Sequence, residues 1–286
     1  MHDDLRLLII EGNPDALNRQ MAAAGLTTNG AQYAASVRQF APGARIAFAH
    51  PADPGARLPR GLALRDFDGV ILGGSGLHVR VRGNAPAVAR QVDLVRDVFR
   101  AGVPLLGSCW GLQVAAVAAG GDVQPCAQGR EVGICRNIVL NGRGRAFPLF
   151  DGKARTFSSL AIHYDEVTRL PAGARVLAGN GHSRIQAAEF RWLNGWFFGV
   201  QYHPEFDFAH MAGLYRLYAD KLPGLKGLPD AAAVTGAAQA FDRLHRDPGD
   251  RQAARRVGAD TSACDVRVRR REIDNWLHFC RIARSA

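Results

Sequence analysis

The sequence contains few cysteines, and their arrangement argues against two kinds of protein. Its 286 residues include five cysteines, an odd number scattered along the chain, and no two of them form a CxxC pair. A disulfide framework and a structural zinc site are therefore both disfavoured. We expect a reducing compartment, in which a single cysteine can act as a nucleophile.

Long apolar runs are also absent. No stretch approaches the roughly 18 unbroken apolar residues that a membrane-spanning helix requires. The chain does not begin like a signal peptide, because residues 1–4 include two acids and the short apolar run after them is interrupted by Arg6. These features predict a cytoplasmic protein with no membrane segment.

The charge is strongly positive but lacks the pattern of a nucleic-acid-binding surface. The formal net charge is +10 and the isoelectric point is about 10.0. The basic residues are spread along the whole chain, and aromatic residues that could stack on bases do not alternate with them. The densest group leads into an expected C-terminal helix and consists of Arg267, Arg269, Arg270 and Arg271. We interpret the excess as a solvated basic face and expect no nucleic-acid partner.

Short apolar runs bounded by turn residues alternate with helical spacing over the first part of the chain. Strands are expected at 5–10, 45–49, 68–72 and 103–107, and helices at 14–24, 86–100 and 112–119. Shorter strands follow at 132–140, 166–170, 175–178, 185–190 and 196–201. This alternation predicts an α/β domain with a mostly parallel central sheet flanked by helices.

The last part of the chain differs in composition and in its expected secondary structure. A helix is expected from Phe206 to Leu222, whereas residues 223–265 are rich in Gly, Ala, Asp and Arg and predict short helices and loops. A final amphipathic helix at 270–281 places four apolar side chains on one face: Ile273, Trp276, Leu277 and Cys280. We therefore predict a main domain at 1–222 and a helical C-terminal extension at 223–286, whose final helix packs on the same domain.

Cys109 is the candidate nucleophile. It lies in Gly107-Ser108-Cys109-Trp110-Gly111, between an expected buried strand and an expected helix. Glycines two residues to either side permit a sharp turn that presents the thiol above the sheet, the cysteine counterpart of a nucleophile elbow. The adjacent helix N-terminus favours the thiolate. An isolated cysteine is more often buried and inert, which is how we interpret the other four.

A base and a residue that orients it are expected in Tyr202-His203-Pro204-Glu205. On an extended chain residues two apart project to the same side, so His203 and Glu205 can lie together, and Pro204 disfavours helix at the histidine. Glu205 can then accept a hydrogen bond from the imidazole while the ring faces the thiol. A metal role for this pair lacks a convincing third ligand, and we expect neither a metal nor a cofactor.

A glycine-rich loop, Gly73-Gly74-Ser75-Gly76, ends the expected strand at 68–72. Such a loop can direct backbone N–H groups toward a developing oxyanion. A phosphate-binding loop and a plain turn are the alternatives, but the segment lacks both the GKS/GKT ending of a P-loop and the full GxGxxG spacing.

Taken together, these segments resemble the class I (triad) glutamine amidotransferases, the family that includes the glutaminase domain of GMP synthetase. The likeness is greatest to stand-alone, GMP-synthetase-like members and spans about residues 5–222. Its motifs occur in the family's order. They are Gly73-Gly74, Gly107-Ser108-Cys109-Trp110-Gly111-Leu112-Gln113, Gly129-Arg130-Glu131-Val132-Gly133, Ile162-His163-Tyr164-Asp165 and Gln201-Tyr202-His203-Pro204-Glu205.

The resemblance implies a flavodoxin-like fold and a set of roles. Cys109 would attack the side-chain amide carbon of glutamine, His203 would move protons, and Glu205 would orient the imidazole. Backbone N–H groups of Gly74 and Trp110 would form the oxyanion hole. The substrate would be held by Gln113 and by the chain around Ile162, His163 and Tyr164.

Two departures leave the substrate open. Ile162 stands where the family has serine, and Ser75 stands where it has proline. We expect hydrolysis of glutamine through a γ-glutamyl thioester, with ammonia passed to an acceptor or to a partner synthase subunit. The alternatives are a γ-glutamyl hydrolase acting on a conjugate and a non-catalytic regulatory relative.

Overall fold

The computed structural model describes residues 5–285, so the acidic start at residues 1–4 lies outside the described residues. The strands are β1 (Arg6–Ile10), β2 (Arg45–Ala49), β3 (Gly69–Leu72), β4 (Leu105–Ser108), β5 (Asp122–Pro125), β6 (Glu131–Leu140), β7 (Thr156–His163), β8 (Asp165–Arg169), β9 (Arg175–Gly179), β10 (Ala187–Trp192) and β11 (Gly195–Val200). The helices are α1 (Asp15–Ala23), α2 (Asn29–Phe40), α3 (Ala85–Ala101), α4 (Trp110–Ala118), α5 (Gly142–Arg145), α6 (Phe208–Leu217), α7 (Ala231–Arg246), α8 (Arg251–Val257), α9 (Thr261–Cys264), α10 (Val266–Arg269) and α11 (Arg271–Ser285).

A nine-stranded sheet forms the centre of the molecule, in the order β2-β1-β3-β4-β11-β10-β9-β6-β7. The strands from β2 to β11 pair in parallel, and those from β11 to β7 pair antiparallel. Strands β5 and β8 pair separately. The predicted α/β architecture, with a central sheet flanked by helices, is therefore confirmed.

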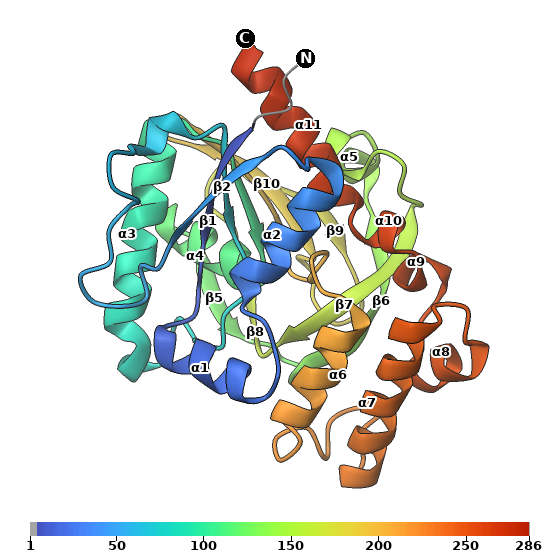
Figure 1. Cartoon of the computed structure of the whole chain (residues 1–286). Helices are drawn as coiled ribbons and strands as arrows, with labels where there is room; N and C mark the ends of the chain where they lie inside the picture. The colour runs from blue at the N-terminus through green and yellow to red at the C-terminus, as the bar shows by residue number, and fades with distance from the viewer. Residues whose placement is uncertain (1–4, 286) are drawn as a thin grey trace.

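Alternation along the strands divides the core between the two faces of the sheet. On β1, Leu7 and Ile9 join a cluster with Tyr33 of α2 and Trp276 of α11. Residues Leu8 and Ile10 instead face α3 and α4. Successive strand side chains point to opposite faces, so a continuous apolar run such as β1 is buried on both sides. Figure 1 shows the sheet between these helices.

The expected strands and helices of the first part of the chain are confirmed, with boundary differences of one or two residues. Two long elements were not predicted: helix α2 and strand β7. The final helix is also confirmed, and its four apolar residues are fully buried in the core beneath the sheet. Its described length reaches Ser285, beyond the predicted end at 281.

The expectation for residues 223–265 was wrong in one respect, because it includes the 16-residue helix α7. The Asp230 side chain caps this helix by accepting a hydrogen bond from the Ala233 N–H. An apolar stripe along α7, including Val234, Phe241 and Leu244, packs against α6 and gives the helix a tertiary partner. The preceding helix, α6, ends at Leu217 rather than Leu222. Helices α6, α7 and α8 lie together beside the sheet (Figure 1).

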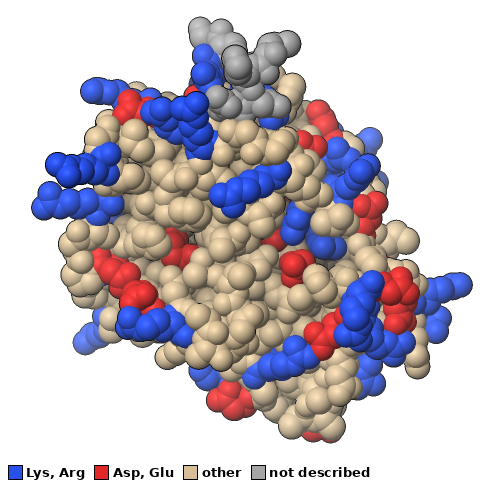
Figure 2. Space-filling model, viewed as in Figure 1, with Lys and Arg blue, Asp and Glu red and all other residues tan. Residues whose placement is uncertain are grey.

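On one face of the molecule the positive charge is dispersed (Figure 2). On the face shown in Figure 2, Lys and Arg side chains are interspersed with acidic and uncharged residues rather than joined in one patch. Within residues 5–285, no helix combines the length and apolar character needed to cross a membrane.

Candidate active site

The predicted nucleophile, base and glycine loop follow three neighbouring parallel strands. Cys109 follows β4, the Gly73-Gly74 pair follows β3, and His203 lies three residues beyond β11. Because the carboxyl ends of parallel strands meet at one edge of a sheet, segments far apart in sequence converge there. The order β3-β4-β11 places Cys109 between the loop and the histidine.

Cys109 occupies a strained turn between β4 and α4. Its backbone has φ 51° and ψ −100°, which is unusual for a residue other than glycine. The flanking glycines are required by close packing. A Cβ on Gly111 would lie 2.0 Å from the Leu72 carbonyl oxygen, and one on Gly107 would lie 2.7 Å from the Gly111 carbonyl carbon. The predicted elbow is therefore present, and Cys109 is 5% exposed.

His203 and Glu205 lie side by side, as the spacing predicted. Nδ1 of His203 is 2.7 Å from Oε1 of Glu205, and both side chains are buried. The imidazole stacks on the Phe206 ring with centroids 3.9 Å apart. Burial lowers the pKa of His203, but the negative charge of Glu205 and then that of the Cys109 sulfur outweigh this effect and raise it to about 10. The ring is therefore suited to hold a proton next to the sulfur.

Glu205 is itself held by residues that sequence reasoning did not assign to the site. The Ser108 hydroxyl donates to Oε1 of Glu205 at 3.1 Å. The Tyr33 phenol is buried nearby, and burial together with the charge of Glu205 raises its pKa well above the usual value. The Glu205 carbonyl oxygen accepts hydrogen bonds from Ser36 and Arg270, each at 3.3 Å. These contacts restrict the position of Glu205 beside His203.

The glycine loop abuts the imidazole. A Cβ added to Gly74 would lie 2.6 Å from Cε1 of His203. The loop is fixed from both sides, because Asn29 Nδ2 donates to the Gly74 carbonyl at 2.9 Å and the Gly111 N–H donates to the Gly73 carbonyl at 3.1 Å. Trp110 begins helix α4, where backbone N–H groups have no intrahelical acceptor. The two predicted oxyanion donors thus belong to segments that flank Cys109.

A cavity of about 160 Å³ opens beside the Cys109 thiol. Seven of the nine predicted site residues line it: Gly74, Cys109, Gln113, Ile162, His163, Tyr164 and His203. Glu205 lies behind the imidazole, and the Trp110 indole N–H donates to Gln91 Oε1 at 2.7 Å, away from the cavity. The carbonyl oxygen of Ile162 is 3.8 Å from the Cys109 sulfur.

Two predicted substrate-binding side chains are engaged within the protein. Gln113 donates to the Asp165 carbonyl at 2.8 Å. His163 contacts Glu131 through Nε2 at 2.9 Å and the Asp165 carbonyl through Nδ1 at 3.1 Å. Burial raises the pKa of Glu131, but the hydrogen bond and charge of His163, with a further hydrogen bond from Asn180, lower it to about 2. These side chains fix the walls of the cavity, while Tyr164 is 45% exposed at its edge.

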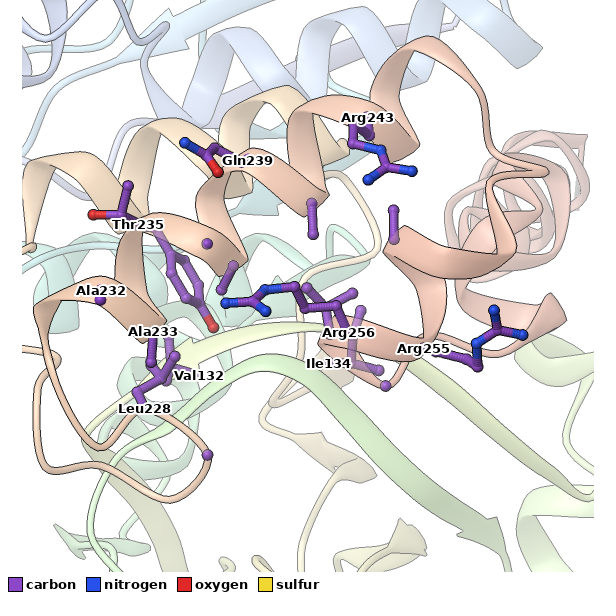
Figure 3. Close-up of a pocket in the computed structure, with 18 of the residues that line it drawn as sticks. Val132, Ile134, Leu228, Ala232, Ala233, Thr235, Gln239, Arg243, Arg255 and Arg256 are labelled. Carbon is purple, nitrogen blue, oxygen red and sulfur yellow. The ribbon is translucent and has the colours of Figure 1, made fainter.

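A second, larger hollow of about 1240 Å³ lies between α7, α8 and β6. Figure 3 shows Thr235 and Gln239 of α7 and Arg256 of α8 around it. None of the predicted site residues lines this hollow. Within residues 5–285, no group of three or more His, Cys, Asp and Glu side chains is arranged to hold a metal ion.

Comparison with known proteins gives a consistent assignment. The family model for class I glutamine amidotransferase matches residues 46–213. A γ-glutamyl-L-1-hydroxyisopropylamide hydrolase from a Pseudomonas species is 32% identical over 280 residues, covering 96% of this chain and 92% of that protein. The glutamine-hydrolysing GMP synthase of Carboxydothermus hydrogenoformans is 32% identical over 182 residues, which cover 63% of this chain but 34% of the synthase.

Solved structures agree at the level of the fold. A glutamine amidotransferase from Thermotoga maritima superposes with a TM-score of 0.60 at 16% identity, covering 97% of this chain and 99% of that one. One from Methylobacillus flagellatus gives 0.60 at 18% identity, with coverages of 97% and 95%. The predicted flavodoxin-like fold is thereby confirmed, and the relatives indicate an amidotransferase or hydrolase. The chain belongs to the class I glutamine amidotransferase family.

Proposed function

We propose that this chain hydrolyses the γ-amide bond of a γ-glutamyl compound through a thioester on Cys109. The observation that carries this proposal is the position of the Cys109 thiol. It sits in a strained elbow, beside a buried imidazole held 2.7 Å from Glu205, at a cavity edged by the Gly74 loop. Nucleophile, base, orienting carboxylate and candidate oxyanion donors therefore meet at one point.

The reaction follows from these positions. The Cys109 thiolate attacks the γ-carbonyl carbon, and the oxyanion is stabilised by the backbone N–H groups of Gly74 and Trp110. The C–N bond then breaks, and the amine leaves with a proton from His203. Water attacks the resulting thioester and gives a proton back to His203, which releases glutamate and restores the thiolate–imidazolium pair. Glu205 holds the imidazole in place through both steps.

The relatives point to two substrates. Glutamine would release ammonia, which a partner synthase or an acceptor would consume, as the glutamine-hydrolysing GMP synthases suggest. An N-substituted γ-glutamyl amide would release an amine instead. The Pseudomonas hydrolase favours the second substrate, because its similarity runs through the C-terminal helices as well as the amidotransferase domain. The five cysteines are free thiols, which supports a cytoplasmic location for either reaction.

Covalent labelling is the most direct test. We expect 6-diazo-5-oxo-L-norleucine to modify Cys109 stoichiometrically, as measured by mass spectrometry of the intact protein and its peptides. Glutamate release from glutamine and from γ-glutamyl alkylamides, assayed in parallel, then ranks the two substrates. If neither labelling nor glutamate release exceeds that of Cys109→Ala protein, the hydrolytic proposal is wrong and a regulatory role takes its place.

The glycine loop gives a second prediction. In Gly74→Ala the new methyl group would lie 2.6 Å from Cε1 of His203, so the loop or the imidazole must move. A displacement of this kind should lower kcat by about 10- to 100-fold, measured as glutamate release under substrate saturation.

Gly83→Ala is the matched control, because a Cβ there would have no heavy atom within 4 Å. Its kcat should equal that of wild type. An unchanged kcat in Gly74→Ala would contradict the proposed position of the loop against the base.

A further inference from the structure

Two cationic side chains line the catalytic cavity without a carboxylate partner. Arg130 precedes β6, and Lys221 follows α6. Within residues 5–285, neither forms an ion pair with an acidic side chain. An uncompensated cation at a cavity wall is a recognition element for an anionic group of a ligand.

Arg130 is directed toward the cavity by its neighbour. Glu131 points into the protein, where its carboxylate accepts hydrogen bonds from Asn180 at 2.9 Å and from Gln186 at 2.8 Å. Because adjacent residues of an extended chain project to opposite sides, the preceding side chain faces the other way. The half-buried Glu131 therefore anchors the segment that presents Arg130.

Aromatic rings hold the cations in place. The Arg130 guanidinium carbon lies 5.9 Å from the Tyr164 ring centroid and 6.0 Å from that of Tyr218. The Lys221 ammonium lies 5.6 Å from the same Tyr218 ring. Both charges thus border one ring at the edge of the cavity. Cation–π contacts of this kind position the charge without neutralising it.

Among the described residues that line the cavity, Arg130 and Lys221 are the only Arg and Lys, and Asp165 is the only Asp or Glu. Asp165 Oδ2 is 2.8 Å from Nδ1 of His78. Glu205 does not line the cavity, and its Oε1 lies 2.7 Å from Nδ1 of His203. Arg130 and Lys221 therefore remain the two cations at this wall without an acidic partner among the described residues.

We infer that Arg130 and Lys221 bind a carboxylate of the substrate. The inference rests on the proposed function. The carboxylate has two sources, the α-carboxylate of the glutamyl group and a carboxylate on the departing amine. Either carboxylate would meet the same two cations. Substrates that differ by one carboxylate on the leaving amine distinguish the two sources.

The test uses L-γ-glutamyl-p-nitroanilide and L-γ-glutamyl-3-carboxy-4-nitroanilide, which differ by one carboxylate on the leaving group. Arg130→Gln and Lys221→Gln should each raise KM by about tenfold, with kcat within about twofold of wild type. A rise for both compounds assigns the cations to the α-carboxylate. A rise confined to the carboxylated compound assigns them to the leaving amine. Unchanged KM in both variants, or a loss confined to kcat, overturns the inference.

Two controls complete the design. Arg255→Gln and Lys226→Gln remove equal charges at the second hollow, which shares no lining residue with the catalytic cavity, and should leave KM unchanged. Titration calorimetry of the same compounds into Cys109→Ala protein gives a second readout that needs no turnover. There the Kd should rise about tenfold when either cation is also neutralised, and an unchanged Kd overturns the inference. Inactive wild-type protein would count against the proposed hydrolysis alone.

Discussion

Replacing Cys109 by alanine should reduce glutamate release by about 10³-fold or more, because the thioester can no longer form. The backbone around Cys109 is fixed by its N–H, which donates to the Val200 carbonyl at 2.8 Å, so the fold should persist. The measurement is steady-state turnover, with circular dichroism and thermal unfolding recorded on the same samples. Full activity in the Cys109→Ala protein would exclude this thiol as the nucleophile.

Two further variants separate chemistry from structure. Cys264→Ala removes a cysteine that lies in α9, outside the cavity, and should retain wild-type turnover. Cys109→Gly should be as inactive as Cys109→Ala but more stable by about 1–3 kcal/mol, because glycine adopts φ 51° without the strain of a side chain. Equal stability of the two Cys109 variants would show that the elbow is not strained.

Glu205→Gln should lower kcat by about 10²- to 10⁴-fold while leaving substrate binding nearly unchanged. The carboxylate accepts from Nδ1 of His203 at 2.7 Å and sets the orientation of the ring. Its charge also offsets the burial of the imidazole. In the neutral variant burial still lowers the pKa of His203, but the charge of Glu205 no longer raises it. The pKa should therefore fall from its raised value of about 10.

The pH profile makes this prediction specific. In the proposed reaction the departing amine takes a proton from the imidazolium, so wild-type activity should persist into alkaline solution and decline as the pH rises through about 10. In Glu205→Gln the decline should begin at lower pH. Ser108→Ala is the matched control, since it keeps the carboxylate and removes one hydrogen bond of 3.1 Å. If activity of Glu205→Gln declines at the same alkaline pH as that of wild type, the orienting role proposed for Glu205 is contradicted.

Much of the site could be predicted from local sequence, because its geometry is local. The spacing of His203 and Glu205 on extended backbone is sufficient to place them together. Gly107 and Gly111 are needed wherever a strand turns sharply into a helix, so the elbow could be predicted without the fold. The alternation of apolar strands with helices likewise predicts parallel strands, whose carboxyl ends meet at one edge.

Other features depended on contacts between distant segments. Asn29 reaches the Gly74 loop across 45 residues, and Ser108 reaches Glu205 across 97. The cations at the cavity wall come from segments more than 90 positions apart, and no local pattern distinguishes Arg130 or Lys221 from the many other basic residues. Helix α7 was underestimated because an alanine-rich segment gains most of its stability from the neighbour it packs against.

The sequence by itself therefore determined the fold class and the candidate triad, since both follow from short-range spacing and strand–helix alternation. Only the tertiary structure decided which side chains support Glu205, which wall of the cavity carries charge, and how the C-terminal helices pack. These outcomes depend on the strand order β3-β4-β11 and on the packing of the core around these strands. Burial and pairing then set the charge of each group, because both depend on neighbours that the chain supplies from elsewhere.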